Sequence, residues 1–148
     1  MLGDTDSLWY ASNRADQFAR ALPPGIYGLS NEFLDTPWPK LVRVRARFAE
    51  LLASPLAEDR ETFLGLLLDM LADRQTAVLE SLPAGDLSPE WARKLSAPFV
   101  LDPGYGTRCS TVLTARDDGA LALVERRFDA AGNVSGQSEH LLNGADGL

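Results

Sequence analysis

Apolar residues recur at helical spacing in the middle of the chain, and this pattern predicts two main helices. The first is expected over about residues 39–53, with Asp35 or Thr36 as its N-cap and Pro39 in its first turn. Its apolar face would contain Leu41, Val44, Phe48, Leu51 and Leu52. The second is expected over about 58–72 and would bury Phe63, Leu66, Leu67, Met70 and Leu71.

Turn and cap residues delimit the remaining elements. Ser88 followed by Pro89 predicts the start of a short third helix. Both ends of the chain have the alternating or β-branched composition of strands, separated by glycine- and proline-containing turns. We expect strands at 8–11, 17–22 and 26–30 as a meander, then at 107–115, 120–128 and 134–142, the last as a polar edge strand. This order predicts an α+β fold with mainly antiparallel sheet.

Size and charge narrow the function classes. The chain has 148 residues, within the range of one domain, so we expect a single domain over 1–148. Its net charge of −7 argues against non-specific nucleic-acid binding, which needs a basic surface. No apolar run is long enough to span a bilayer, and no secretory signal pattern opens the chain. The expected compartment is therefore the cytoplasm.

The chain has one cysteine and one histidine, which excludes a zinc site built from several Cys and His ligands. We therefore expect no metal site. Cys109 is interpreted as a small buried strand residue rather than a thiol nucleophile, since alternation would turn Arg108 to the other face. A Cys109–His140 dyad is possible if the outer strands face each other, but an exposed His140 is favoured.

Four basic residues lie in the first predicted helix, largely off its apolar face: Lys40, Arg43, Arg45 and Arg47. They could form an anion site, but we favour a solvated helix surface. The glycine-containing segment 103–107 lacks the lysine of a phosphate loop and precedes a strand, so it is interpreted as a tight turn. The residues alone thus predict an α+β domain in which no catalytic residue is identified.

Three strings carry a family resemblance. Residues 25–31 (GIYGLSN), followed by 34–40 (LDTPWPK), resemble the central signature of the NRDE family, whose members are similar to transport and Golgi organization protein 2. Residues 105–111 (YGTRCST) resemble a second signature, and 7–14 fit the segment before the first. The signature positions, whose roles are unknown, are Asn31, Asp35, Thr36, Trp38, Tyr105, Gly106, Thr107, Arg108 and Cys109.

The resemblance implies an architecture like that of N-terminal-nucleophile (Ntn) hydrolases, an αββα sandwich. Members of this family typically begin with Met-Cys, and the Asn-Arg-Asp-Glu motif follows soon after. This chain begins Met1-Leu2 and has neither feature. We therefore expect it to correspond to the C-terminal portion of such a protein. An Ntn mechanism uses the side chain of residue one as nucleophile, so no residue here inherits that role, Cys109 included.

The resemblance also implies three functional hypotheses. The favoured one is a non-catalytic protein of intracellular haem or lipid trafficking, in which His140, Cys109 or Tyr105 could ligate haem iron by residue type alone. The alternative is a hydrolase of amide or thioester bonds, which would require the N-terminal segment. The third is self-association through exposed sheet.

Overall fold

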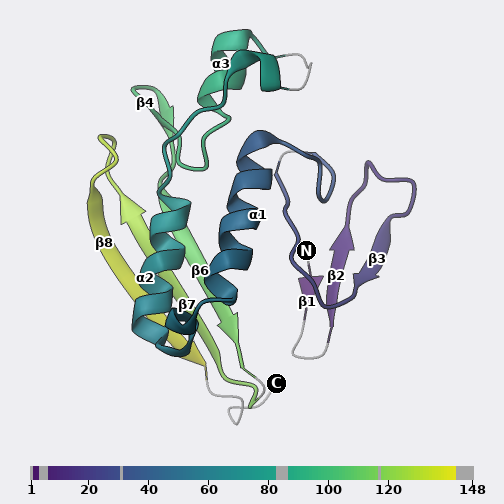
Figure 1. The fold of residues 1–148 in the computed structure, drawn as a ribbon, viewed down its shortest axis with the longest axis vertical. Coiled ribbons are helices and arrows are strands. Elements are labelled where there is room, and N and C mark those ends of the chain that lie inside the picture. The colour runs from purple at the N-terminus through teal and green to yellow at the C-terminus, as the bar shows by residue number, and fades with distance from the viewer. Residues whose placement is uncertain (1, 4–6, 31, 83–86, 117, 143–148) are drawn as a thin grey trace.

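The computed structural model describes residues 2–3, 7–30, 32–82, 87–116 and 118–142 (Figure 1). Its helices are α1 (Pro39–Leu52), α2 (Arg60–Leu71) and α3 (Pro89–Lys94), with short 3₁₀ turns at Pro55–Glu58 and Leu79–Ser81. Its strands are β1 (Leu2–Gly3), β2 (Leu8–Ala11), β3 (Ala19–Leu22), β4 (Leu101–Asp102), β5 (Tyr105–Gly106), β6 (Cys109–Ala115), β7 (Leu121–Phe128) and β8 (Val134–Leu142). This mixture of helices and small antiparallel sheets confirms the α+β prediction.

The largest sheet is the antiparallel meander β6–β7–β8, with β6 and β8 at its edges. Cys109 is opposite Arg127, and Leu123 is opposite both Leu113 and His140. The turn before β7 contains Gly119 at φ 80°, and the turn before β8 contains Gly132 at φ 76°, a backbone region that glycine enters without steric cost. The hairpin and the edge strand predicted from the sequence are confirmed.

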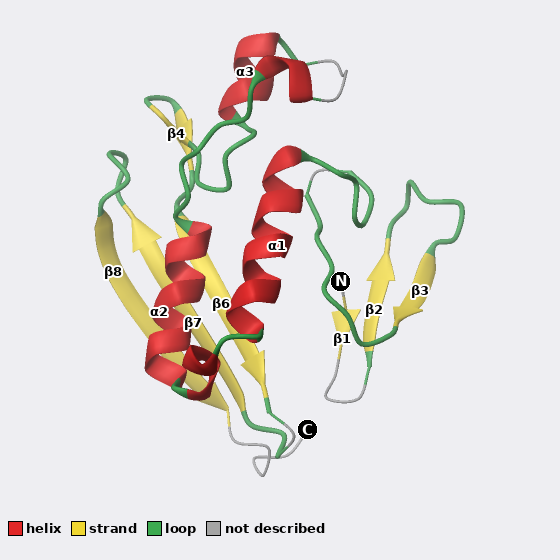
Figure 2. Ribbon diagram, viewed as in Figure 1, coloured by secondary structure: helices red, strands yellow, loops and turns green. Residues whose placement is uncertain are grey.

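Helices α1 and α2 cover one face of this sheet, as Figures 1 and 2 show. The buried centre between them contains Leu51, Leu67, Leu68, Val112 and Val124. Arg126 of β7 pairs with Asp69 of α2 at 3.8 Å, and Arg60 of α2 pairs with Glu139 of β8. These contacts fix α2 across the strands.

The other face of the β6–β8 sheet remains exposed. Side chains alternate between faces along a strand, so Cys109, Thr111 and Leu113 lie opposite the helices. Leu113 and Leu142 are each 64% exposed on this outer face.

The N-terminal sheet differs from the predicted meander. β1, β2 and β3 form it, whereas the strand expected at 26–30 does not exist. That segment is extended, but its backbone bonds to other partners: Gly28 exchanges hydrogen bonds with Asp35, and the Ile26 carbonyl accepts one from Arg45. The prediction of a strand at 26–30 is therefore wrong, because these contacts take the place of strand pairing.

Of the two predicted helix N-caps, the structure confirms one and contradicts the other. Ser88 caps α3 by accepting a hydrogen bond from the Trp91 amide at 3.3 Å, which confirms that prediction. The predicted capping of α1 by Asp35 or Thr36 is wrong, because the N-cap position is Trp38 and it offers no side-chain cap. Among the described residues, no helix combines the length and apolar character needed to cross a membrane.

Leu68→Ala should lower the free energy of unfolding by about 2–5 kcal/mol, because Leu68 is 1% exposed and its truncation leaves a cavity between α2 and the sheet. Urea denaturation followed by circular dichroism measures the change. Leu142→Ala, on the exposed face, is the matched control and should change stability by less than about 0.5 kcal/mol. Equal losses in the two variants would contradict this assignment of the core.

Candidate functional site

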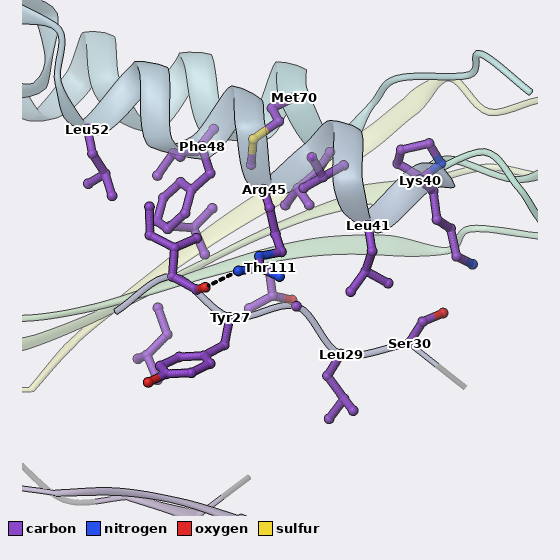
Figure 3. A pocket seen from close by; sticks show the side chains of 18 of the residues that line it. Tyr27, Leu29, Ser30, Lys40, Leu41, Arg45, Phe48, Leu52, Met70 and Thr111 are labelled. Carbon is purple, nitrogen blue, oxygen red and sulfur yellow. Dashed lines mark hydrogen bonds between the residues drawn. The ribbon is translucent and has the colours of Figure 1, made fainter. Parts of the chain in front are cut away.

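A cleft of about 730 Å³ opens between segment 26–30, α1, α2 and the edge strand β6 (Figure 3). Its walls are mostly apolar, with Leu41, Val44, Phe48, Leu52, Phe63, Leu67, Met70, Leu71, Val112 and Leu113 among the lining residues. This size and lining are typical of small-molecule sites, which combine apolar walls with a few polar groups. It is the candidate functional site.

The wall formed by segment 26–30 is held to α1 through Asp35. The Asp35 carboxylate accepts a hydrogen bond from the Gly28 amide at 2.7 Å and lies 2.9 Å from a guanidinium nitrogen of Arg45. The Asp35 amide returns a hydrogen bond to the Gly28 carbonyl at 2.7 Å. Asp35 has a φ of 63°, a conformation that Asp tolerates better than most residues. We call Gly28, Asp35 and Arg45 the clasp.

Two further contacts make the clasp specific to these residues. Besides its ion pair with Asp35, Arg45 donates a hydrogen bond to the Ile26 carbonyl at 2.8 Å, drawn as a dashed line in Figure 3. A Cβ atom on Gly28 would lie 2.2 Å from Leu41 Cδ2, so a larger residue cannot approach α1 this closely without a shift. The two parts of the first signature therefore meet at Gly28 and Asp35, next to α1.

The interpretation of the four basic residues of α1 as a solvated helix surface is wrong for three of them. Arg43 pairs with Asp73 at 2.9 Å and donates to the Gln75 carbonyl, while Arg45 belongs to the clasp. Lys40 donates to the Leu95 carbonyl at 2.8 Å. Arg47 alone of the four fits the expectation, since it is half exposed and pairs only with Glu50 of its own helix. The long side chains of this cluster thus join α1 to three other segments.

The second signature mostly braces the hairpin before β6. The Thr107 hydroxyl accepts a hydrogen bond from the Val100 amide at 3.0 Å, and the Thr107 amide donates to the Val100 carbonyl. A Cβ on Gly106 would lie 3.0 Å from that carbonyl, so glycine permits the close approach. Tyr105 packs edge-on against the half-exposed Trp91, with ring centroids 6.0 Å apart. These contacts hold the hairpin in its conformation.

Cys109 is exposed, so its prediction as a buried residue is wrong. Alternation along β6 was correctly expected, but Ser110 and Val112 are the residues that face the helices. His140 is exposed, as favoured. The two do not form a dyad: the positions opposite them on β7, Arg127 and Leu123, are four residues apart.

The other described signature positions do not line the cleft. Thr36 donates its hydroxyl hydrogen to the Phe33 carbonyl at 2.9 Å, and Trp38 precedes α1 with a buried indole N–H that has no hydrogen-bond partner among the described residues. Arg108 is exposed, and Asn31 lies outside the described residues. Within the described part of the chain, no three His, Cys, Asp or Glu side chains gather as a metal site would require.

The sequence did not reveal the cleft, because its walls come from distant segments. Its clearest local signal is the pair Gly28 and Asp35, which both belong to the first signature. Thr111 is the member of the second signature that lines the cleft. The consecutive residues 111–115 all line it, so the cleft borders both faces of the edge strand β6.

Comparison with known proteins gives a consistent result. The family model described as Transport and Golgi organisation 2 matches residues 1–130. The Transport and Golgi organization protein 2 homolog of Homo sapiens is 34% identical over 125 residues, which cover 82% of this chain and 45% of the human protein. The Bos taurus homolog is 34% identical over 126 residues and the Mus musculus homolog 32% over 125, with the same coverage.

Asp35→Ala should destabilise the protein by about 2 kcal/mol, because it removes a charge-assisted hydrogen bond and places Ala at a positive φ. Asp35→Asn can keep an acceptor for the Gly28 amide, so its free energy of unfolding should fall by only about 1 kcal/mol or less. This is the contribution of the partly exposed ion pair with Arg45 that the variant loses. Chemical denaturation of both variants measures the difference. An alanine variant as stable as the original would show that the clasp does not hold the wall.

Proposed function

The chain belongs to the Transport and Golgi organisation 2 family, and from this premise we propose that it holds a lipid-type ligand in the cleft as part of a trafficking protein. The chain spans about half the length of the curated relatives it matches, 45% of the human protein, so the proposal concerns the part described here. The human and bovine relatives are named for transport and Golgi organization, and this supports the proposal of a carrier.

The observation that carries the proposal is the apolar cleft. Its walls present leucine, valine, phenylalanine and methionine side chains from α1, α2 and β6, and none of the described residues that line it is acidic. Burying a hydrocarbon chain there would remove apolar surface from water on both partners, at about 25 cal/mol per Å². A lipid tail is the ligand class that gains most from such walls.

Haem fits the described residues less well than a lipid does. The three ligands expected by residue type, Tyr105, Cys109 and His140, do not line the cleft, and all three side chains are exposed. Met70 lines the cleft and has a thioether that can ligate iron, but methionine in cytochromes acts together with a histidine. We therefore propose lipid rather than haem as the cargo.

The hydrolase alternative has no described contact in its favour. Cys109 lies on the outer face of β6, and the register separates it from His140. The alternative remains a hypothesis for a longer polypeptide with an N-terminal cysteine.

We extend the proposal to the arrangement of the whole protein. An αββα sandwich would place a second sheet on the outer face, where Leu123 and Leu142 are exposed. Self-association through the same face is the competing hypothesis for what covers it. The proposed location is the cytoplasm.

Leu52→Gln should weaken binding of the fluorescent fatty acid cis-parinaric acid roughly fivefold, because it replaces an apolar wall residue by a polar one. Val42→Gln is the control on the same helix: Val42 is 55% exposed against 46% for Leu52, but only Leu52 lines the cleft. Fluorescence titration measures both. Absence of binding by the unmodified chain would refute lipid carriage, and equal weakening by both variants would place the ligand elsewhere.

A further inference from the structure

The chain has two lysines, and their surroundings are opposite. The Lys94 ammonium lies 2.7 Å from Asp102 and 2.9 Å from Glu90. Hydrogen bonds to these two carboxylates raise the pKa of Lys94 above its usual value. The positive charge of Lys94, on α3, is therefore balanced by the carboxylates of neighbouring residues.

Lys40 lines the cleft and makes no ion pair with any carboxylate among the described residues. Its ammonium donates one hydrogen bond, to the Leu95 carbonyl at 2.8 Å, and lies 6.0 Å from the centre of the Trp38 ring. An ammonium group has three donors, so two are left for other partners. Burial lowers the pKa of Lys40, which shows the cost of keeping this charge partly out of water.

The other charged residue that lines the cleft is already neutralised. Arg45 pairs with Asp35 in the clasp and also donates to the Ile26 carbonyl. In a chain of net charge −7, the mostly apolar cleft therefore contains a cation, Lys40, that has no acidic partner within the described part of the chain. A cation held partly out of water is stabilised by an anion that binds next to it.

The position of Lys40 suits an elongated ligand. Lys40 and Leu52 lie near opposite ends of α1, about 18 Å apart along the axis at 1.5 Å per residue. Figure 3 shows Lys40 and Ser30 towards one end of the cleft and Leu52 at the other. The walls between them are mostly apolar, with Leu41, Val44 and Phe48 of α1 lining the cleft. Arg45, which the clasp holds, and Thr111 are polar residues labelled between the two ends.

We propose that Lys40 binds the anionic head group of an amphipathic ligand whose hydrocarbon tail occupies the cleft. This inference rests on the proposed lipid function and names the ligand class: a long-chain carboxylate or alkyl phosphate rather than a neutral lipid. Both anions accept hydrogen bonds from an ammonium group, so the experiment includes each.

The test is isothermal titration calorimetry of the chain with palmitate, hexadecyl phosphate and hexadecanol, below their micellar or solubility limits. At least one anion should bind roughly tenfold more tightly than hexadecanol, the value expected for one charged hydrogen bond. Lys40→Met should remove this preference and leave hexadecanol binding within about twofold, while Lys40→Arg should retain most of it. Lys94→Met removes the same charge outside the cleft. It should leave the affinity for each of the three ligands unchanged.

Labelling supplies a second measurement. Reductive methylation read by mass spectrometry reports on both lysines, and the preferred anion should protect Lys40 but not Lys94.

The outcomes separate the two proposals. If none of the three ligands binds the unmodified chain, lipid carriage itself fails. If all bind and the anions show no advantage, the cleft takes lipids but the head-group inference is wrong. If Lys40→Met weakens all ligands equally, Lys40 acts by joining α1 to the segment at Leu95, and the inference is again overturned. A preference for one anion that Lys40→Met abolishes supports it and identifies the head group.

Discussion

The cleft depends on the contact by which Asp35 holds segment 26–30 against α1. One carboxylate satisfies the Gly28 amide and neutralises Arg45, while Arg45 in turn satisfies the Ile26 carbonyl. An extended segment outside a sheet must find partners for its backbone groups, and here side chains supply them. Without this contact, one wall of the cleft would have no fixed position relative to the helix.

The core and the cleft share the same helix–sheet layer. α2 buries Leu67 and Leu68 against β6 and β7, and Leu67 also lines the cleft. The cleft is therefore a continuation of the core towards the edge strand β6, where the helices no longer cover the sheet completely. This explains why its walls are apolar in a strongly acidic protein: they consist of the same residues that stabilise the fold.

Most of the positively charged side chains of α1 are paired with a carboxylate. Arg43, Arg45 and Arg47 each have a carboxylate partner, whereas Lys40 has a carbonyl oxygen. Lys40 also places a positive charge next to the end of α3, where carbonyl groups favour a cation. The same group can serve this structural contact and still present donors to a ligand, because an ammonium group donates in three directions.

The sequence by itself determined α1, α2, α3 and the β6–β8 meander, because helical periodicity, caps and turn residues act locally. It also determined the family, through strings that contain Gly28 and Asp35 of the clasp and Thr107, which bonds to Val100. The tertiary structure decided three things: that 26–30 bonds to side chains instead of a strand, that Cys109 faces outward, and that the basic residues of α1 join distant segments. Alternation tells which residues of β6 share a face, but only the packing of α1 and α2 selects the face that is buried. The cleft has the same origin, since its walls are more than 80 residues apart in sequence, from Ile26 to Ala115, and meet only when the chain folds.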